Sequence, residues 1–322
     1  MRLHDPKSCA IPSAADGMAN ATDCDDQSEP HQGVLRPLTK EELRLYYYLS
    51  RGSPHQPLME GAAVKLEYVP LFQVQRKLQG MPCNYDRFRQ YLRTIAAPDG
   101  TSLELPSLIA MNPMGKEHVT ELLDALLAMD ADGIAVRATA EASARLQDTP
   151  GDCKITLIIA DDLKGGWTNR YANEFTHRFQ CGGPTGILPR WLKDFWITGL
   201  LWSSEPASEG AVRKAILTAA YRTAFVQQHG AARTLRERLA QEGAVMAMAG
   251  CTEPVLDPED IAYTREVLAL FMEAEDMRAC IECLFGDDAG RTLGFTPRGL
   301  SPWAGLALAL HDARLNDAQH AQ

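Results

Sequence analysis

Apolar and polar residues are arranged along residues 106–230 as expected for strands separated by helices. Short apolar runs occur at 107–111, 133–136, 155–160 and 195–202, and segments with apolar residues every three or four positions follow them. Alternating strands and helices are typical of right-handed crossovers in a parallel sheet. Four or five strands are too few for an eight-fold barrel, so the pattern predicts an α/β fold: an open, mostly parallel sheet with helices on both faces.

Helical spacing marks the helices of this core. They are predicted at residues 119–127, 139–146 and 168–179, with a long helix that starts near Ser208. In the helix at 168–179, Tyr171, Phe175 and Phe179 recur every four positions. This spacing places the three aromatic side chains on one face, so they are predicted to pack into the core.

Two helical sections are expected to flank the core at 106–230. In the N-terminal section, residues 34–105, a capping box at Thr39 and an N-cap at Asn84 each start a helix. A weak strand pattern occurs there at 64–69. The C-terminal extension, residues 231–322, is predicted to be helical throughout.

Start and stop signals define the helices of that extension. Asp257 and Pro258 are predicted to start a helix of about seven turns, because proline suits the first helical position. Gly286 is predicted to end this helix, because glycine is common just past the last helical residue. Ser301 and Pro302 start the last helix.

Composition narrows the classes of protein to consider. Residues 1–33 are rich in Asp, Ser, Pro and Gly and are expected to be a disordered leader, with Met18 as an alternative start. No apolar run approaches the roughly 18 residues of a membrane helix, and no secretory signal occurs, so a soluble cytoplasmic protein is expected. The net charge of −10 argues against a nucleic-acid-binding protein.

Two acids, Asp161 and Asp162, follow the most apolar of the predicted strands. Ligands of open α/β sheets bind beyond the carboxyl ends of the strands. Adjacent carboxylates there can hold Mg²⁺ or Mn²⁺, or one can act as a general base. The plainer interpretation is an Asp that caps the next turn.

The segment after these acids offers groups for an anionic substrate. Lys164, Gly165, Gly166 and Trp167 lie between strand and helix, and Arg170 lies at the start of the helix. Glycines let the backbone approach a ligand, and a helix N-terminus attracts anions. The glycine spacing matches neither a Walker loop nor a dinucleotide fingerprint, so a simple tight turn is the alternative.

Glu174 and His177 have the carboxylate–imidazole spacing of di-metal carboxylate bundles. Such sites need a second pair of this kind, and the chain has none; a surface Arg–Glu pair beside a solvated histidine is the alternative. Glu205 follows the strand at 195–202 as a further metal ligand or as a helix-initiating acid. Asn112 and the group 116–118 are expected at the same sheet edge as Asp161.

The cysteines carry weaker signals. Cys280 and Cys283 have the spacing of a thiol metal or redox motif, but they fall within a predicted helix, where small apolar packing is the simpler role. Cys181 precedes two glycines that are ordinary helix-stop residues. Neither a Gly-x-Ser-x-Gly elbow nor a His-Glu-x-x-His helix occurs, which disfavours those hydrolase classes.

These features predict a small-molecule enzyme, a hydrolase or lyase that depends on a divalent cation and acts on an anionic substrate. Asp161, Asp162 and His177 would be catalytic, and the metal ligands would come from Asp161, Asp162, Glu174, His177 and Glu205. Lys164, Gly165, Gly166, Trp167, Arg170 and Asn112 would bind the substrate. The alternatives are a non-catalytic ligand-binding or homo-oligomer-assembly protein, and a redox or haem-type protein.

Overall fold

The computed structural model describes residues 65–100, 102–146, 152–163, 169–179 and 195–320. All of them belong to the compact unit Leu49–Gln322. The following sequence predictions lie outside the described residues: the leader at 1–33, the capping box at Thr39, the segment Lys164, Gly165, Gly166 and Trp167, and Cys181.

A parallel sheet forms the centre of this unit and confirms the predicted α/β class. It consists of β1 (Lys65–Tyr68), β2 (Asp152–Ala160) and β3 (Phe195–Trp202) in the order β1-β2-β3. In the register, Ile155 of β2 lies opposite Tyr68 on one side and Ile197 on the other. The weak strand pattern at 64–69 is therefore a strand of the same sheet.

Strand β2 is apolar throughout because both faces of the sheet are buried. Ile155, Leu157 and Ile159 point to one face, which α5 (Ala131–Arg145) and α7 (Glu209–His229) cover. Ile158 points to the other face. That face is covered by α2 (Phe72–Gln79), α3 (Tyr85–Ile95) and the 3₁₀ helix η2 (Pro106–Ala110).

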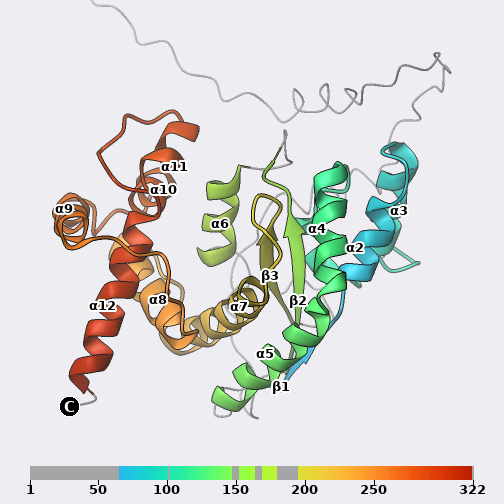
Figure 1. Cartoon of the computed structure of the whole chain (residues 1–322), viewed down its shortest axis with the longest axis horizontal. Coiled ribbons are helices and arrows are strands. Elements are labelled where there is room, and N and C mark those ends of the chain that lie inside the picture. The colour runs from blue at the N-terminus through green and yellow to red at the C-terminus, as the bar shows by residue number, and fades with distance from the viewer. Residues whose placement is uncertain (1–64, 101, 147–151, 164–168, 180–194, 321–322) are drawn as a thin grey trace, which may run out of the picture. The chain divides into compact units, whose positions relative to one another are not determined.

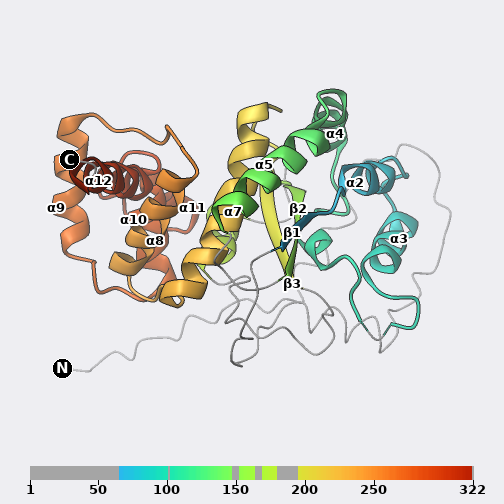
Figure 2. The same cartoon turned by 90° about the horizontal axis from the view of Figure 1, so that it is seen from below.

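Helix α4 (Glu117–Ala128) packs on α2, and α6 (Arg170–Phe179) connects the sheet to the C-terminal helices. Those helices are α8 (Leu235–Met248), α9 (Pro258–Ala269), α10 (Met277–Phe285), α11 (Asp287–Thr292) and α12 (Ala304–His320). Both Figure 1 and Figure 2 place α2 and α3 on one side of the strands and the C-terminal helices on the other.

Helices α8 and α12 make a close pair in the C-terminal part. A Cβ atom on Gly243 of α8 would lie 2.5 Å from the carbonyl oxygen of Ala309 in α12. Glycine is required here because no side chain fits between the two backbones. Among the described residues, no helix is both long and apolar enough to cross a membrane.

Two predicted strands are helical in the structure. The run 107–111 lies largely in η2, where Pro106 occupies the first turn and Leu108 packs beneath the sheet. The run 133–136 lies in the first turns of α5, where the carboxylate of Asp130 accepts a hydrogen bond from the Gly133 amide. Short apolar runs suit a buried strand and a buried helix equally; Pro106 at the start of η2 and the Asp130 cap of α5 favour the helix.

The sheet is also smaller than predicted, with three strands among the described residues instead of four or five. The predicted seven-turn helix is two helices, α9 and α10, because Asp276 caps a second start through the Ala279 amide. Other signals are confirmed. Asn84 caps α3, Ser208 caps α7, and Gly286 ends α10.

Candidate functional site

Polar side chains meet at the carboxyl edge of the sheet, as the sequence predicts. We call Asn112, His118, Asp161, Asp162 and Ser203 the edge cluster. The Asp161 carboxylate accepts hydrogen bonds from His118 Nε2 at 2.7 Å, from the Ser203 hydroxyl at 2.8 Å and from the Asn112 amide at 2.8 Å. Asp161 is buried, so these neighbours replace water around its charge.

Hydrogen bonding keeps Asp161 ionised. Burial alone would raise the pKa of Asp161, but the bonds from His118, Asn112, Ser203 and the Leu163 amide outweigh it and lower this pKa. A carboxylate only accepts, so His118 Nε2 carries the proton of this bond. The other ring nitrogen of His118, Nδ1, is buried and has no partner in the part of the chain that the structure describes.

Arg170 connects the edge cluster to the end of β3. Its guanidinium donates to Asp162 at 3.3 Å and pairs with Glu205, and it lies 5.0 Å from the ring centroid of Trp202 and 5.2 Å from that of Trp303. Arg170 therefore has two acidic partners and two aromatic neighbours. The predicted substrate-binding arginine is held within the protein by its own neighbours.

Four of the five predicted metal ligands, Asp161, Asp162, Glu174 and Glu205, are engaged in similar bonds. Within the described ranges, no group of three or more His, Cys, Asp or Glu side chains is placed to hold a metal ion. Asp161 and Asp162 face hydroxyl, amide and imidazole donors, and Glu205 faces Arg170. The structure gives the divalent cation no support, and metal binding stays a prediction.

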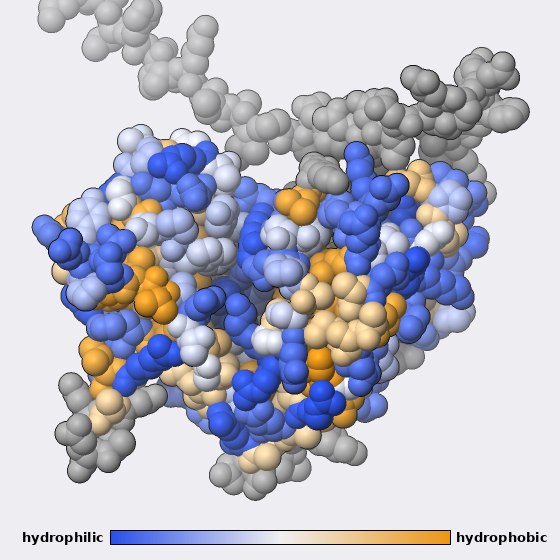
Figure 3. All heavy atoms as spheres, in the orientation of Figure 1, coloured by the Kyte–Doolittle hydropathy of each residue, from blue (hydrophilic) through white to orange (hydrophobic). Residues whose placement is uncertain are grey.

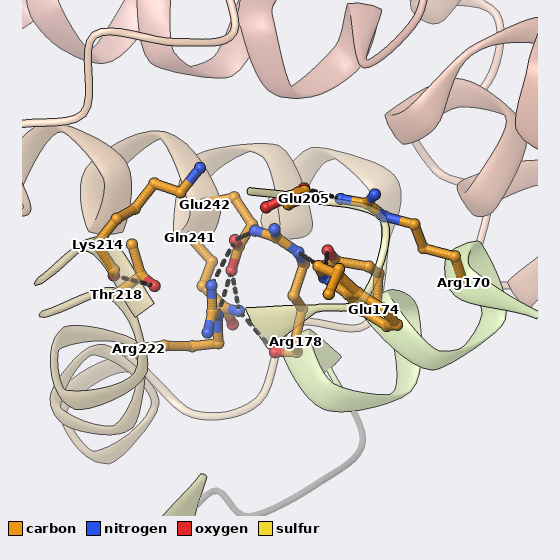
Figure 4. Close-up of polar contacts among 10 residues, drawn as sticks. Arg170, Glu174, Arg178, Glu205, Lys214, Thr218, Arg222, Gln241 and Glu242 are labelled. Atoms are coloured by element: carbon orange, nitrogen blue, oxygen red, sulfur yellow. Dashed lines mark hydrogen bonds and ion pairs between the residues drawn. The ribbon is translucent and has the colours of Figure 1, made fainter. Parts of the chain in front are cut away.

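A buried ion network joins α6, α7, α8 and β3 (Figure 4). We use this name for Glu174, Arg178, Arg222 and Glu242. Glu242, which is fully buried, pairs with Arg178 and accepts from Arg222 at 2.7 Å. Glu174 accepts from Arg178 at 2.8 Å and from the indole nitrogen of Trp202 at 2.7 Å.

The charges in this network compensate one another. Burial alone would raise the pKa of Glu242, but Arg222 and Arg178 outweigh it and lower this pKa to about 2. The pKa of Glu174 is lowered in the same way, against burial, by the positive charges of Arg178 and Arg170. At neutral pH, two carboxylates and two guanidinium groups are thus paired inside the protein.

The ion network forms one wall of a cavity of about 560 Å³. Strand β3, helices α6, α7 and α12, Met246 of α8 and the segment 251–255 surround it. Figure 3 shows a hollow on this face, between the C-terminal helices and the rest of the unit, with hydrophilic residues around it. A cavity of this size suits a small organic molecule.

Three ionisable cavity-lining side chains, of His177, Lys214 and Glu253, have no hydrogen bond or ion pair to any described residue. In Figure 4 no dashed line reaches the ammonium group of Lys214. Burial lowers the pKa of His177 to about 4. The negative charge of Glu174 raises this pKa and the positive charge of Arg222 lowers it, but burial has the largest effect. At pH 7 the cavity therefore presents a neutral imidazole and a free cation.

The neutral state of His177 predicts a pH dependence of stability. The unfolded chain binds a proton at this histidine below about pH 6.5, and the folded protein does so only near pH 4. The free energy of unfolding should therefore fall between pH 6.5 and pH 4, by about 2 kcal/mol given partial exposure of the ring. Urea denaturation at pH 7 and pH 5 measures this change. The free energy of unfolding should fall less in His177→Gln than in the wild type, and an equal fall in both proteins would contradict the prediction.

The sequence located part of this site and missed part of it. Glu174, His177, Arg170 and Glu205 line the cavity. Lys214, Arg178 and Arg222 were missed, although a signal exists: Lys214, Thr218 and Arg222 recur every four positions on the otherwise apolar helix α7. No protein-family model, no curated protein and no solved structure matches this chain.

Proposed function

We propose that this protein is a small-molecule enzyme that binds an organic anion in the cavity beside β3. The observation that carries the proposal is the ammonium group of Lys214, which pairs with no described residue. Lys214 is exposed to solvent, so water weakens its attraction in part, but a cation that lines a cavity without such a partner still favours a negatively charged ligand.

The pairing of the other charges supports the choice of an anion. Arg170, Arg178 and Arg222 each have an acidic partner, and Glu174 and Glu205 each have an arginine partner. The charges of these side chains therefore compensate one another without a bound ligand. Glu253 also lines the cavity and, like Lys214, is exposed to solvent, so water screens its charge.

His177 is proposed to transfer the proton. A neutral imidazole can accept a proton from a bound substrate and return it, and Lys214 would stabilise the negative charge that develops. This assigns the reaction to acid–base chemistry, of which hydrolases and lyases are examples. A dependence on Mg²⁺ or Mn²⁺ stays a prediction, and no step of the proposal uses a metal.

Replacing Lys214 with methionine should weaken anion binding ten- to hundredfold. Methionine keeps the length of the side chain and removes the charge, and a hydrogen bond to a charged group contributes about 1.5–3 kcal/mol. Calorimetric titration with acetate, hexanoate, succinate and inorganic phosphate measures the effect. Lys77→Met on the exposed surface of α2 is the matched control and should bind like the wild type.

Three outcomes are informative. Binding of an anion that needs Lys214 supports the proposal, and a turnover activity lost in His177→Gln with binding kept supports the enzymatic part. Binding without any turnover would favour the non-catalytic ligand-binding alternative. If none of the four anions binds, or if Lys214→Met binds them as the wild type does, the proposal is wrong.

A further inference from the structure

The wall of the cavity that α7 contributes has two chemically different rows of side chains. Ala211, Ala215 and Ala219 line the cavity at intervals of four residues, and so do Lys214, Thr218 and Arg222. On a helix, both sets form a row parallel to the axis, and the two rows lie side by side. The row of alanines spans about 12 Å at 1.5 Å per residue.

The remaining walls extend the apolar row. Their apolar side chains come from α8, from the segment after it and from α12: Met246, Pro254, Val255, Trp303 and Leu306. Val255 is 69% exposed, so it lies where the cavity opens to solvent. An apolar residue exposed at the mouth of a cavity is typical of a site that contacts an apolar ligand group.

Few polar groups of the cavity are free to bind a ligand. The guanidinium groups of Arg178 and Arg222 donate to Glu174 and Glu242, and the Thr218 hydroxyl donates to the carbonyl oxygen of Lys214. Among the described residues, Lys214, His177 and the exposed Glu253 remain. A sugar or another polyhydroxylated ligand would lose its water without finding enough replacement hydrogen bonds, which is costly.

We infer that the ligand of this cavity is a monocarboxylate with an apolar body. Its carboxylate binds Lys214, with His177 beside it, and its hydrocarbon part lies along the alanines of α7 against Met246, Val255 and Leu306. This inference rests on the proposed anion site and adds the ligand class. Apolar contact then supplies the affinity, and Lys214, the lining cation that pairs with no described residue, selects the charged end.

A series of ligands that differ in one feature tests the class. Hexanoate should bind about thirtyfold or more tightly than acetate, because each additional buried methylene strengthens binding. Hexanamide, which lacks the charge, should bind at least tenfold more weakly than hexanoate. Gluconate, a hydroxylated carboxylate of similar length, should bind no better than acetate. Calorimetric titration of the full chain provides these affinities.

A surface variant separates apolar contact from folding. Val255→Ser should weaken hexanoate several-fold and leave acetate unchanged, and Val136→Ser, at a comparably exposed position on α5, should change neither. If acetate, gluconate or phosphate binds as tightly as hexanoate and still needs Lys214, the ligand class is wrong and the anion site stands. If hexanoate binds equally tightly in Lys214→Met, the anion site itself is wrong. Failure of all these ligands to bind overturns both.

Discussion

Replacing Glu242 with glutamine is expected to destabilise the folded protein by about 3–5 kcal/mol. The change keeps the shape of the side chain and removes its charge, which leaves Arg178 and Arg222 with one carboxylate, Glu174, in place of two. Removing one partner of a buried ion cluster is costly because the remaining charge has no water to replace it. Urea denaturation of wild type and variant at pH 7 measures the difference.

An exposed pair provides the control for this variant. Glu273 pairs with Arg236 on the surface, where both side chains are largely accessible, so Glu273→Gln should leave the urea midpoint nearly unchanged. An equally small shift for Glu242→Gln would show that water reaches the network and would contradict its burial.

The same network should respond to acid. The folded pKa of Glu242 is about 2, below its unfolded value, so its contribution is complete above about pH 4.5 and is lost as the pH falls toward 2.

Asp161→Ala is expected to destabilise the protein by about 3–4 kcal/mol. The change leaves His118 Nε2 and the Asn112 amide without their acceptor at the buried end of β2, and leaves the Ser203 hydroxyl with Asp162 alone. Each unsatisfied buried group is costly. Thermal and urea denaturation measure the loss. Asp124→Ala removes an exposed carboxylate that pairs with Arg76 and should have little effect.

The outcome for Asp161 also bears on its predicted catalytic role. A loss of stability at neutral pH, with anion binding retained in the folded fraction, would identify Asp161 as a positioning residue that orients His118. An unchanged stability would mean that the hydrogen bonds at the sheet edge contribute little. In that case the structural role assigned to the edge cluster is wrong.

Elements with strong local signals could be predicted from the sequence. The apolar run of β2, the strand at 195–202 and the caps Asn84 and Ser208 were all identified correctly. Each depends on residues close in the chain: a continuous apolar run for a strand buried on both faces, and a side-chain oxygen that accepts from the first amides of a helix.

Short apolar runs and long helices were harder to predict. The runs at 107–111 and 133–136 are helical because Pro106 and Asp130 favour helical starts, which four or five apolar residues do not reveal. The predicted helix from Pro258 to Phe285 is interrupted because Asp276 starts a second helix. A capping residue outweighs the apolar pattern at Asp130 and Asp276, and the fixed backbone angle of proline does so at Pro106.

The sequence by itself determined that acids and amides would gather at the carboxyl edge of a parallel sheet, because the strand direction brings the ends of neighbouring strands together. The contact of Ser203 with Asp161 and Asp162, at the ends of β3 and β2, follows from that rule. Asn112 reaches Asp161 from the end of η2, and Arg170 reaches Asp162 from α6. Only the tertiary structure decided which charges are paired. Arg178 and Glu242 lie 64 positions apart and meet because α6 packs near α8, and this pairing leaves Lys214 as the cavity-lining cation without a partner among the described residues. Pairing of distant charges depends on packing, which no local pattern of residues encodes.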